Sequence, residues 1–313
     1  MAKPRARTTP DIEITFKSHA TRDRFLPQRT ILRVKNVMYE DASGPQRPLS
    51  RRQLKEVLSS GDLSIFDKSQ ARALLYARKK GKKITSGEQT LDTKEHEQLK
   101  AKEEISERTF IEAEKTRAVE DIAQFFKHFS AWHDFRHELI LRNIAKAPKP
   151  IAGQFGTAHS IMWPQLYRQH PDKKLKRNIR PVVFHWLMRV FRKISAGKKP
   201  TPIEYKKGFL DTLGGNLYRH ESQRVNATEK EQILSAAFFG SLIDRLTEEQ
   251  TDLLLRERDR NKINPKLFAM NGLPAEPNKR QVVNWLQKHS PFWKREETIR
   301  QMKKKGSFRG QGS

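Results

Sequence analysis

Cysteine is absent from this 313-residue chain. Its absence excludes disulfide bonds, cysteine nucleophiles and every cysteine-ligated zinc or iron–sulfur site. Long apolar runs are also missing: the best one, 233–243, is interrupted by Ser235 and Ser241 and falls well short of the ~20 residues that a spanning helix needs. Residues 1–10 carry basic side chains with no apolar stretch behind them, which is not the pattern of a signal peptide. We therefore expect a soluble, cytoplasmic protein with no membrane partner.

Acidic residues are few relative to basic ones. The chain has 36 Asp and Glu against 63 Lys and Arg, a net charge of +27 with neutral histidines. Such a surplus favours a polyanionic partner, because each cation set against a phosphate releases condensed counterions. The basic residues are spread along the chain instead of gathering on one amphipathic helix, which disfavours an anionic membrane as the partner. Nucleic acid is the predicted class of partner.

Composition and local pattern predict a mainly α fold. Hydrophobic residues make up 35% of the chain and charged residues 32%, which supports a modest core and many solvated helix faces. We expect a multi-helix core domain, preceded by a long helix and a small basic N-terminal region, with disordered basic tails. The predicted boundaries are a basic region with two short helices (1–87), a long charged helix (88–147), a helical core that is the candidate nucleic-acid-binding domain (157–256), and a C-terminal helix with a basic tail (257–313).

The N-terminal region contains one predicted strand and two helix starts. Residues 30–37 mix β-branched and basic residues, which is typical of a strand. Ser50 with Gln53 forms a capping box, and Asp67 with Gln70 repeats the pattern. A helix-turn-helix is one interpretation of this pair, although the connection is longer than the usual three or four residues.

The region between Gly87 and Pro148 contains neither glycine nor proline, which predicts one long helix or a broken pair. Its first half is polar on nearly every side, as in an exposed helix. Its second half places apolar residues, Ile122, Phe126 and Phe129 among them, at three- and four-residue spacing, so one face is expected to be buried. Further helix signals are the cap patterns Thr228–Glu231, Thr247–Gln250 and Asn278, and the Gly214–Gly215 stop.

The one catalytic-looking pattern is His133 and His137, with Asp134 between them. Two histidines at i and i+4 share a helix face and could chelate zinc, but the metalloprotease motif of this kind has Glu where this chain has Asp134. No third ligand follows at a familiar spacing. We therefore interpret the two histidines as polar residues on the outer face of an aromatic-faced helix.

Other marks of catalysis are missing from the sequence. There is no phosphate-cradling glycine loop and no serine in a nucleophile elbow. Most acidic residues lie between Glu95 and Glu120, interleaved with Lys and Arg as on a solvated face. The prediction is a protein that is not an enzyme, with no catalytic residues, no metal ligands and no cofactor.

Aromatic and basic residues alternate between Trp163 and Arg224. Cations hold phosphates, and aromatics among them offer stacking to unpaired bases. The cluster Lys173 to Arg180 also crowds a predicted helix start, where backbone amides attract phosphate. The alternative is that Trp163 and Tyr167 belong to the core while the lysines only keep the chain soluble. The predicted nucleic-acid-binding residues are Lys173, Lys174, Lys176, Arg177, Arg180, Lys206, Lys207, Tyr218 and Arg224.

This segment resembles the FinO/ProQ family of RNA chaperones. The resemblance is carried by Trp163–Pro164–Gln165–Leu166–Tyr167, Leu175–Lys176–Arg177–Asn178–Ile179, Tyr205–Lys206–Lys207–Gly208–Phe209 with Tyr218, and Arg224–Val225. It covers about residues 160–225. It implies a mostly helical domain that grips the base of an RNA hairpin and its single-stranded 3′ end, and it implies contact roles for Lys176, Arg177, Lys206, Tyr218 and Arg224.

The predicted function is that of a non-enzymatic nucleic-acid-binding protein with RNA favoured, such as an RNA chaperone or post-transcriptional regulator. One alternative is a DNA-binding accessory protein of replication, transfer or transcription control that uses the basic segment 50–83. Another is a structural protein of an RNA-rich particle.

Overall fold

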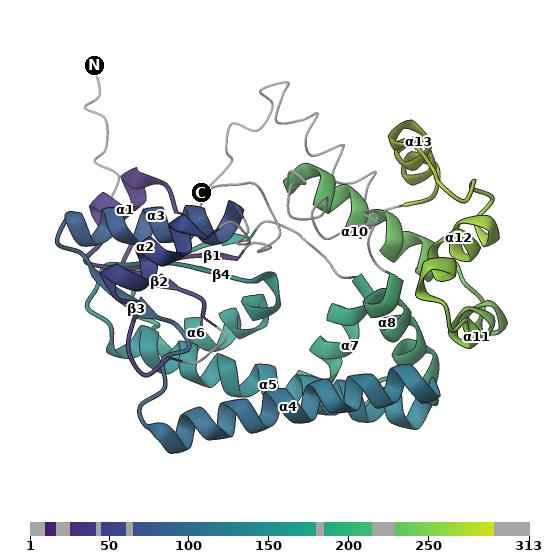
Figure 1. The fold of residues 1–313 in the computed structure, drawn as a ribbon, viewed down its shortest axis with the longest axis horizontal. Coiled ribbons are helices and arrows are strands. Elements are labelled where there is room, and N and C mark those ends of the chain that lie inside the picture. Colours follow the sequence, from purple (N-terminus) through teal and green to yellow (C-terminus); the bar gives the residue numbers. More distant parts are fainter. Residues whose placement is uncertain are drawn as a thin grey trace. The chain divides into compact units, whose positions relative to one another are not determined.

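The computed structural model describes residues 10–16, 26–41, 45–60, 65–179, 185–214 and 229–290. The chain forms two compact units, drawn in Figure 1. Unit 1 comprises residues 1–182, 194–197 and 218–229, and unit 2 comprises residues 183–193, 198–217 and 230–313. The described residues are mostly helical, as predicted, but unit 1 also contains a parallel sheet that the mainly α prediction lacked.

The sheet of unit 1 has five strands in the order β3-β2-β4-β1-β5, all parallel to their neighbours. The strands are β1 (Ile12–Phe16), β2 (Asn36–Tyr39), β3 (Lys83–Ser86), β4 (Ile151–Phe155) and β5 (Leu175–Ile179). Strand β1 lies between β4 and β5, so that Ile12 pairs with both Ile151 and Leu175. Its partners are far away in the chain, and no local pattern indicates such pairing.

One face of the sheet is covered by α1 (Gln28–Arg33), α2 (Arg51–Ser59) and α3 (Ile65–Lys79), as Figure 1 shows. Apolar side chains of these helices, such as Leu54 and Leu74, join Val37 and Tyr39 from the sheet in one buried cluster. The side chains of successive strand residues alternate between the two faces, so Met38 belongs to the cluster on the opposite face.

The predicted strand 30–37 is wrong in its first half. Residues up to Arg33 belong to α1, and β2 begins only at Asn36. Helix α1 follows Pro27, whose carbonyl accepts the first turn's N–H groups, and a short apolar run by itself does not separate helix from strand. The capping box of Ser50 and Gln53 is confirmed at the start of α2. Asp67 is not an N-cap, because α3 begins at Ile65 and includes it in the first turn.

The opposite face is covered by α5 (Val119–Lys146), the 3-10 helix η1 (Thr157–Met162) and α6 (Trp163–Gln169). Ile140 and Ile144 of α5 pack there against β1 and β4 residues. Helix α5 also pairs with α4 (Thr93–Thr116), which confirms the broken pair. The break is Arg117, whose φ of 59° lies in the left-handed region.

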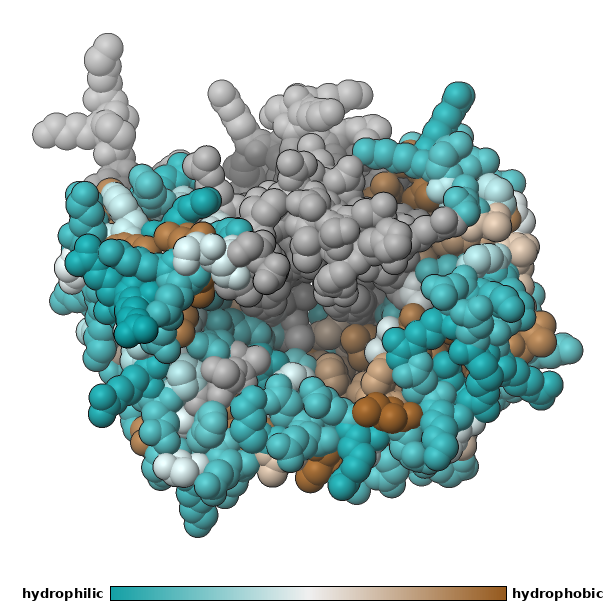
Figure 2. Space-filling view, viewed as in Figure 1, coloured by the Kyte–Doolittle hydropathy of each residue, from teal (hydrophilic) through white to brown (hydrophobic). Residues whose placement is uncertain are grey.

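Helix α4 is exposed over most of its surface, as predicted, and Figure 2 shows the surface along it as mostly hydrophilic. Its buried residues are Leu99, Ser106 and Ala113, which recur every seventh position. That spacing is the narrow seam by which one helix packs along another. Phe110 meets Phe125 of α5 with ring centroids 5.3 Å apart.

Unit 2 is helical in its described residues. It contains most of α7 (His185–Ser195), α8 (Pro202–Gly214), α10 (Glu229–Asp244), α11 (Glu248–Arg256), α12 (Arg260–Met270) and α13 (Lys279–His289). Phe238 anchors the core, with its ring centroid 5.7 Å from that of Phe268 and 5.6 Å from that of Trp285.

The predicted helix signals of unit 2 are largely confirmed. Capping boxes start α11 at Thr247 and α13 at Asn278, and α8 ends at Gly214 as predicted. The cap predicted at Thr228 lies outside the described residues. No helix among the described residues of either unit is long and apolar enough to cross a bilayer.

Candidate functional site

The predicted nucleic-acid-binding residues fall in both units. Lys173, Lys174, Lys176 and Arg177 belong to unit 1, and Lys206 and Lys207 belong to α8 in unit 2. The remaining three lie outside the described residues: Arg180, Tyr218 and Arg224.

On α8, both predicted lysines are engaged inside unit 2. The Lys206 ammonium lies 2.7 Å from Asp252 and 3.4 Å from Glu248. Lys207 is buried, donates a hydrogen bond to the Asp244 carbonyl at 3.2 Å, and lies over the Trp186 ring at 5.2 Å. Burial lowers the pKa of Lys207. These contacts stabilise the packing of α8.

The cluster in unit 1 lies on an edge strand, not at the start of a helix. Leu175–Ile179 forms β5, which hydrogen-bonds to β1. The predicted contribution of helix N-terminal amides to phosphate binding is therefore wrong. Buried and exposed side chains alternate here, as is typical of a strand: Leu175 packs on the core, whereas Lys176, the next residue, is exposed.

The exposed side chains around β5 combine cations with an aromatic ring. The guanidinium of Arg177 lies 5.5 Å from the centre of the Trp163 ring. Tyr167, one helical turn beyond Trp163 on α6, is 60% exposed. The Lys176 ammonium lies 2.5 Å from Glu13 on the neighbouring strand and remains 49% exposed. Lys176 and Arg177 are successive strand residues, so their side chains lie on opposite faces of this edge strand. We define the β5-edge surface as the side chains on both sides of the edge: Tyr167, Arg168, Lys173, Lys174, Lys176 and Arg177.

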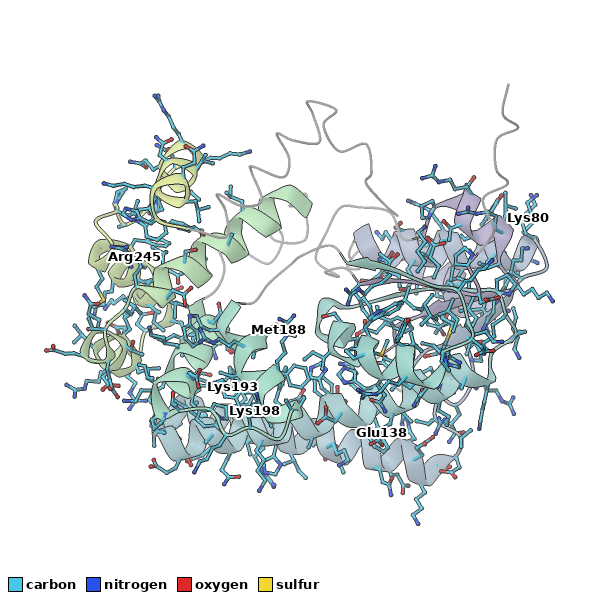
Figure 3. All side chains as sticks on the ribbon, turned by 180° about the vertical axis from the view of Figure 1, so that it is seen from behind. Lys80, Glu138, Met188, Lys193, Lys198 and Arg245 are labelled. Atoms are coloured by element: carbon cyan, nitrogen blue, oxygen red, sulfur yellow. The ribbon has the colours of Figure 1, made fainter. Side chains whose placement is uncertain are left out.

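The basic segment 50–83 forms part of the layer over the sheet. Its two helices, α2 and α3, bury Leu54 and Leu74 against the strands and connect β2 to β3. Arg51 and Lys55 of α2 are exposed, as is Lys80 beyond α3, which is labelled in Figure 3. The segment is thus a crossover connection of the sheet with cations on its outer side.

A second group of polar residues lies where three strands end. Glu40 directly follows β2, Glu88 follows β3 by two residues, and His159 follows β4 by four. Because the carboxyl ends of parallel strands share one edge of a sheet, these three side chains meet there. Helix α5 adds His133, Arg136 and His137. We define the sheet-edge cluster as Glu40, Glu88, His133, Arg136, His137 and His159.

The cluster occupies the place where open α/β sheets bind ligands. The chain leaves β2 toward β3 and leaves β4 toward β5, in opposite directions across the sheet. Adjacent strands whose connections diverge in this way leave a crevice at their carboxyl ends. At this position Glu40 links the two strands, because its Oε2 accepts a hydrogen bond from the backbone N–H of Gly156 after β4.

Arg136 holds the two carboxylates of the cluster. Its guanidinium lies 2.5 Å from Glu88 Oε1 and 2.7 Å from Glu40 Oε1. The other oxygen of Glu88 accepts the N–H of Asp41 at 2.9 Å. Burial raises the pKa of Glu88, and Arg136 opposes that shift. Burial alone would lower the pKa of Arg136, but the two carboxylates outweigh it, so the guanidinium keeps its charge.

The three histidines are buried side by side. Ring centroids are 6.1 Å apart for His133 and His137, 5.7 Å for His133 and His159, and 5.1 Å for His137 and His159. Burial first of all, and then the positive charge of Arg136, holds the pKa of His133 well below its ordinary value. Burial likewise lowers the pKa of His137. Both imidazoles are therefore neutral at pH 7.

The sequence-based placement of His133 and His137 on an outer face is wrong, since each is only 5% exposed. Helix α5 has two buried faces. Its aromatic side, with Phe125, packs on α4, while His133, His137 and Ile140 follow a second stripe toward the sheet. The aromatic stripe in the sequence therefore marks only one of the two buried faces of this helix.

Two sets of residues in the cluster could hold a metal ion. In the set His133, His137 and His159, one ligand atom from each residue lies within 4.8 Å of the others, and the same holds for the set Glu40, Glu88 and His159. Sequence reasoning missed His159 because it follows His137 at no familiar motif spacing. Part of a signal exists: Glu40 and His159 each follow a short, largely apolar stretch that proves to be a strand, whereas the strand before Glu88 has one apolar residue, Ile84.

Comparisons of the chain with protein-family models, with curated proteins and with solved structures find no match in any of the three. The resemblance to the FinO/ProQ family stays a prediction. The functional interpretation therefore depends on the chemistry of the β5-edge surface and of the sheet-edge cluster.

Proposed function

We propose that the protein binds nucleic acid, with RNA favoured over duplex DNA, and that the β5-edge surface makes the principal contacts. The observation that carries the proposal is an exposed aromatic ring close to cations along the chain: Tyr167 is 60% exposed, precedes the exposed Arg168, and lies one turn from Trp163, over which Arg177 is placed. Basic residues alone would bind phosphates of any nucleic acid. An accessible ring beside them favours unpaired bases, which RNA loops and 3′ ends offer.

The charge of the whole chain supports the same partner. With a net charge of +27, long-range attraction to a phosphate backbone raises the association rate at low salt. The cations on the outer side of α2 and α3 would add contacts that do not depend on sequence. Stacking on Tyr167 would contribute roughly 1–3 kcal/mol for a base, enough to distinguish a single strand from a duplex.

The test compares two variant sets of equal charge change. Arg168, Lys174 and Arg177 are all exposed, and their joint replacement by Gln should lower the affinity for a hairpin RNA with a single-stranded 3′ tail. It should also reduce the slope of log affinity against log salt by about 2, since each phosphate contact contributes roughly 0.7–0.9. The matched control replaces three exposed cations of α4 and α5 by Gln, and it should leave the slope nearly unchanged: Lys94, Arg108 and Lys127.

Two further measurements decide the chemistry. Tyr167→Ala should weaken binding of the tailed hairpin while leaving binding of a duplex of equal charge the same. Equal slopes for the β5-edge and control variants would refute the proposed surface. Tighter binding to duplex DNA, lost on replacing Arg51, Lys55 and Arg72 by Gln, would instead assign the function to the α2–α3 segment as a DNA-binding element.

A further inference from the structure

The sheet-edge cluster gathers more metal-ligating chemistry than the proposed nucleic-acid binding uses. Three imidazoles from two segments, α5 and the residues after β4, converge with one ligand atom from each within 4.8 Å of the others. We propose that His133, His137 and His159 bind one zinc-like divalent transition-metal ion. Imidazole nitrogen suits Zn²⁺ and Co²⁺, whereas Mg²⁺ and Ca²⁺ prefer oxygen ligands.

The distances fit this assignment after small side-chain adjustments. Zinc–nitrogen bonds of ~2.0–2.1 Å place two nitrogens of a tetrahedral site about 3.4 Å apart. The ligand atoms lie within 4.8 Å of one another, so rotation about the side-chain bonds suffices to close the site. Two of the ligands, His133 and His137, are four residues apart on α5, which keeps them on one face of a rigid helix.

His159 is oriented as a ligand by a second residue. Its Nε2 lies 3.0 Å from Glu40 Oε1, and Glu40 also accepts hydrogen bonds from Arg136 and Gly156, so His159 is the donor. That bond places the lone pair on Nδ1, which is buried and has no hydrogen-bond partner among the described residues. Histidines that bind a metal usually donate their other ring N–H to a carboxylate, which fixes the tautomer and makes the ligand more basic.

The alternative set of Glu40, Glu88 and His159 is disfavoured by Arg136. The guanidinium already contacts both carboxylates, at 2.7 Å and 2.5 Å, so a divalent ion between them would lie against a fixed positive charge. The imidazoles, in contrast, form no ion pair with Arg136 among the described contacts. When both carboxylates are ionised, they outnumber the single guanidinium in the buried cluster, and the resulting negative charge favours a cation nearby.

Three histidines leave a fourth position on the ion for water or another ligand. Sites with three protein ligands and an open position are typical of catalytic zinc, whereas structural zinc sites are closed by four protein ligands. The proposed site is therefore of the open type, at the edge of the sheet where open α/β folds bind their ligands.

The experiment is a metal titration of the full-length protein. Protein freed of metal with a chelator is titrated with Co²⁺, whose visible absorption reports nitrogen ligation and coordination number, and Zn²⁺ is then added to displace it. We expect one equivalent of Co²⁺, the absorption of a four- or five-coordinate site, and displacement by one equivalent of Zn²⁺. This titration needs only the wild-type protein. Binding of less than half an equivalent of either ion, or the spectrum of hydrated Co²⁺, would overturn the proposal.

Variants locate the ion. His159→Gln and His133→Gln should each weaken binding by 100-fold or more. Glu40→Gln should weaken it by about 10–100-fold, as loss of the carboxylate that orients a metal-binding histidine does. The matched control is His128→Gln, on the same helix but outside the cluster, which should bind like the wild type. Equal binding by His159→Gln and His128→Gln would refute the assignment. Circular dichroism identifies any variant that fails to fold, and in that case the Glu40→Gln affinity decides.

Discussion

Removing the guanidinium of Arg136 should destabilise unit 1 more than any surface change. Its side chain is 5% exposed and lies 2.5 Å from Glu88, which is fully buried. Leucine in place of arginine would leave that carboxylate without its partner, and breaking a buried ion pair in this way costs about 3–5 kcal/mol. Because domains are stable by about 5–15 kcal/mol in total, Arg136→Leu should remove a large part of the stability of this unit.

The assay has to report on unit 1 separately from unit 2. Hydrogen exchange followed by mass spectrometry, in a urea series, gives the opening free energy of peptides that cover β2 and β3. Arg52→Leu is the surface control: Arg52 lies 2.8 Å from Glu56, but the two side chains are 90% and 56% exposed. The opening free energy of that variant should be indistinguishable from that of the wild type, because exposed ion pairs contribute little to stability.

A double variant separates charge burial from packing. In Arg136→Leu with Glu88→Gln, no full charge is left unpaired at position 88, so most of the lost stability should return. The reasoning is refuted if Arg136→Leu costs less than about 1 kcal/mol, or if the double variant is no more stable than the single one, because unpaired charge is what makes the change costly.

Three further changes test the packing around the site and in unit 2. Asn143→Leu should cost about 2 kcal/mol, because its amide donates to the Gly87 carbonyl at 2.9 Å and an acceptor left unsatisfied in the interior is penalised; equilibrium unfolding measures it. Gly87→Ala should also destabilise, by roughly 1–3 kcal/mol, because the added methyl group would collide with the Phe155 ring; a thermal shift of zero would contradict the packing. Burial alone would raise the pKa of Glu204, but hydrogen bonds, chiefly from Lys193, outweigh it and lower the pKa below its ordinary 4.5. The wild type should therefore be more stable than Glu204→Gln above about pH 5, and the difference should shrink as the pH falls below 4.5; melting temperatures at pH 3.5 and 7 check the sign.

Helix ends and breaks were predictable because their signals are local. The capping box at Ser50 involves residues three apart, and the break at Arg117 separates a polar stretch from an apolar one. The sheet was not predictable in the same way. Each strand has four or five residues, too short for a reliable period, and β1 gains its neighbours only from residues near 151 and 175.

The candidate site likewise combines a local pattern, which the sequence shows, with contacts that only the sheet creates. His133 and His137 were recognisable as a possible chelating pair, because i and i+4 positions share a helix face. Their third partner, His159, and the carboxylate of Glu40 join them only through the sheet. Without the order of the strands, an acidic residue after a short apolar run is indistinguishable from one on a solvated surface.

The position of β1 also determines when the sheet can be completed during synthesis. Ile12–Phe16 is made before the other four strands, yet it pairs only with β4 and β5, so it must wait until residues 151–155 have left the ribosome. Until then both edges of this largely apolar segment are unpaired, which exposes it to aggregation or to a chaperone. Pairing over such a separation is slow to form. A chain that ends before residue 151 should therefore leave this strand without a strand to pair with.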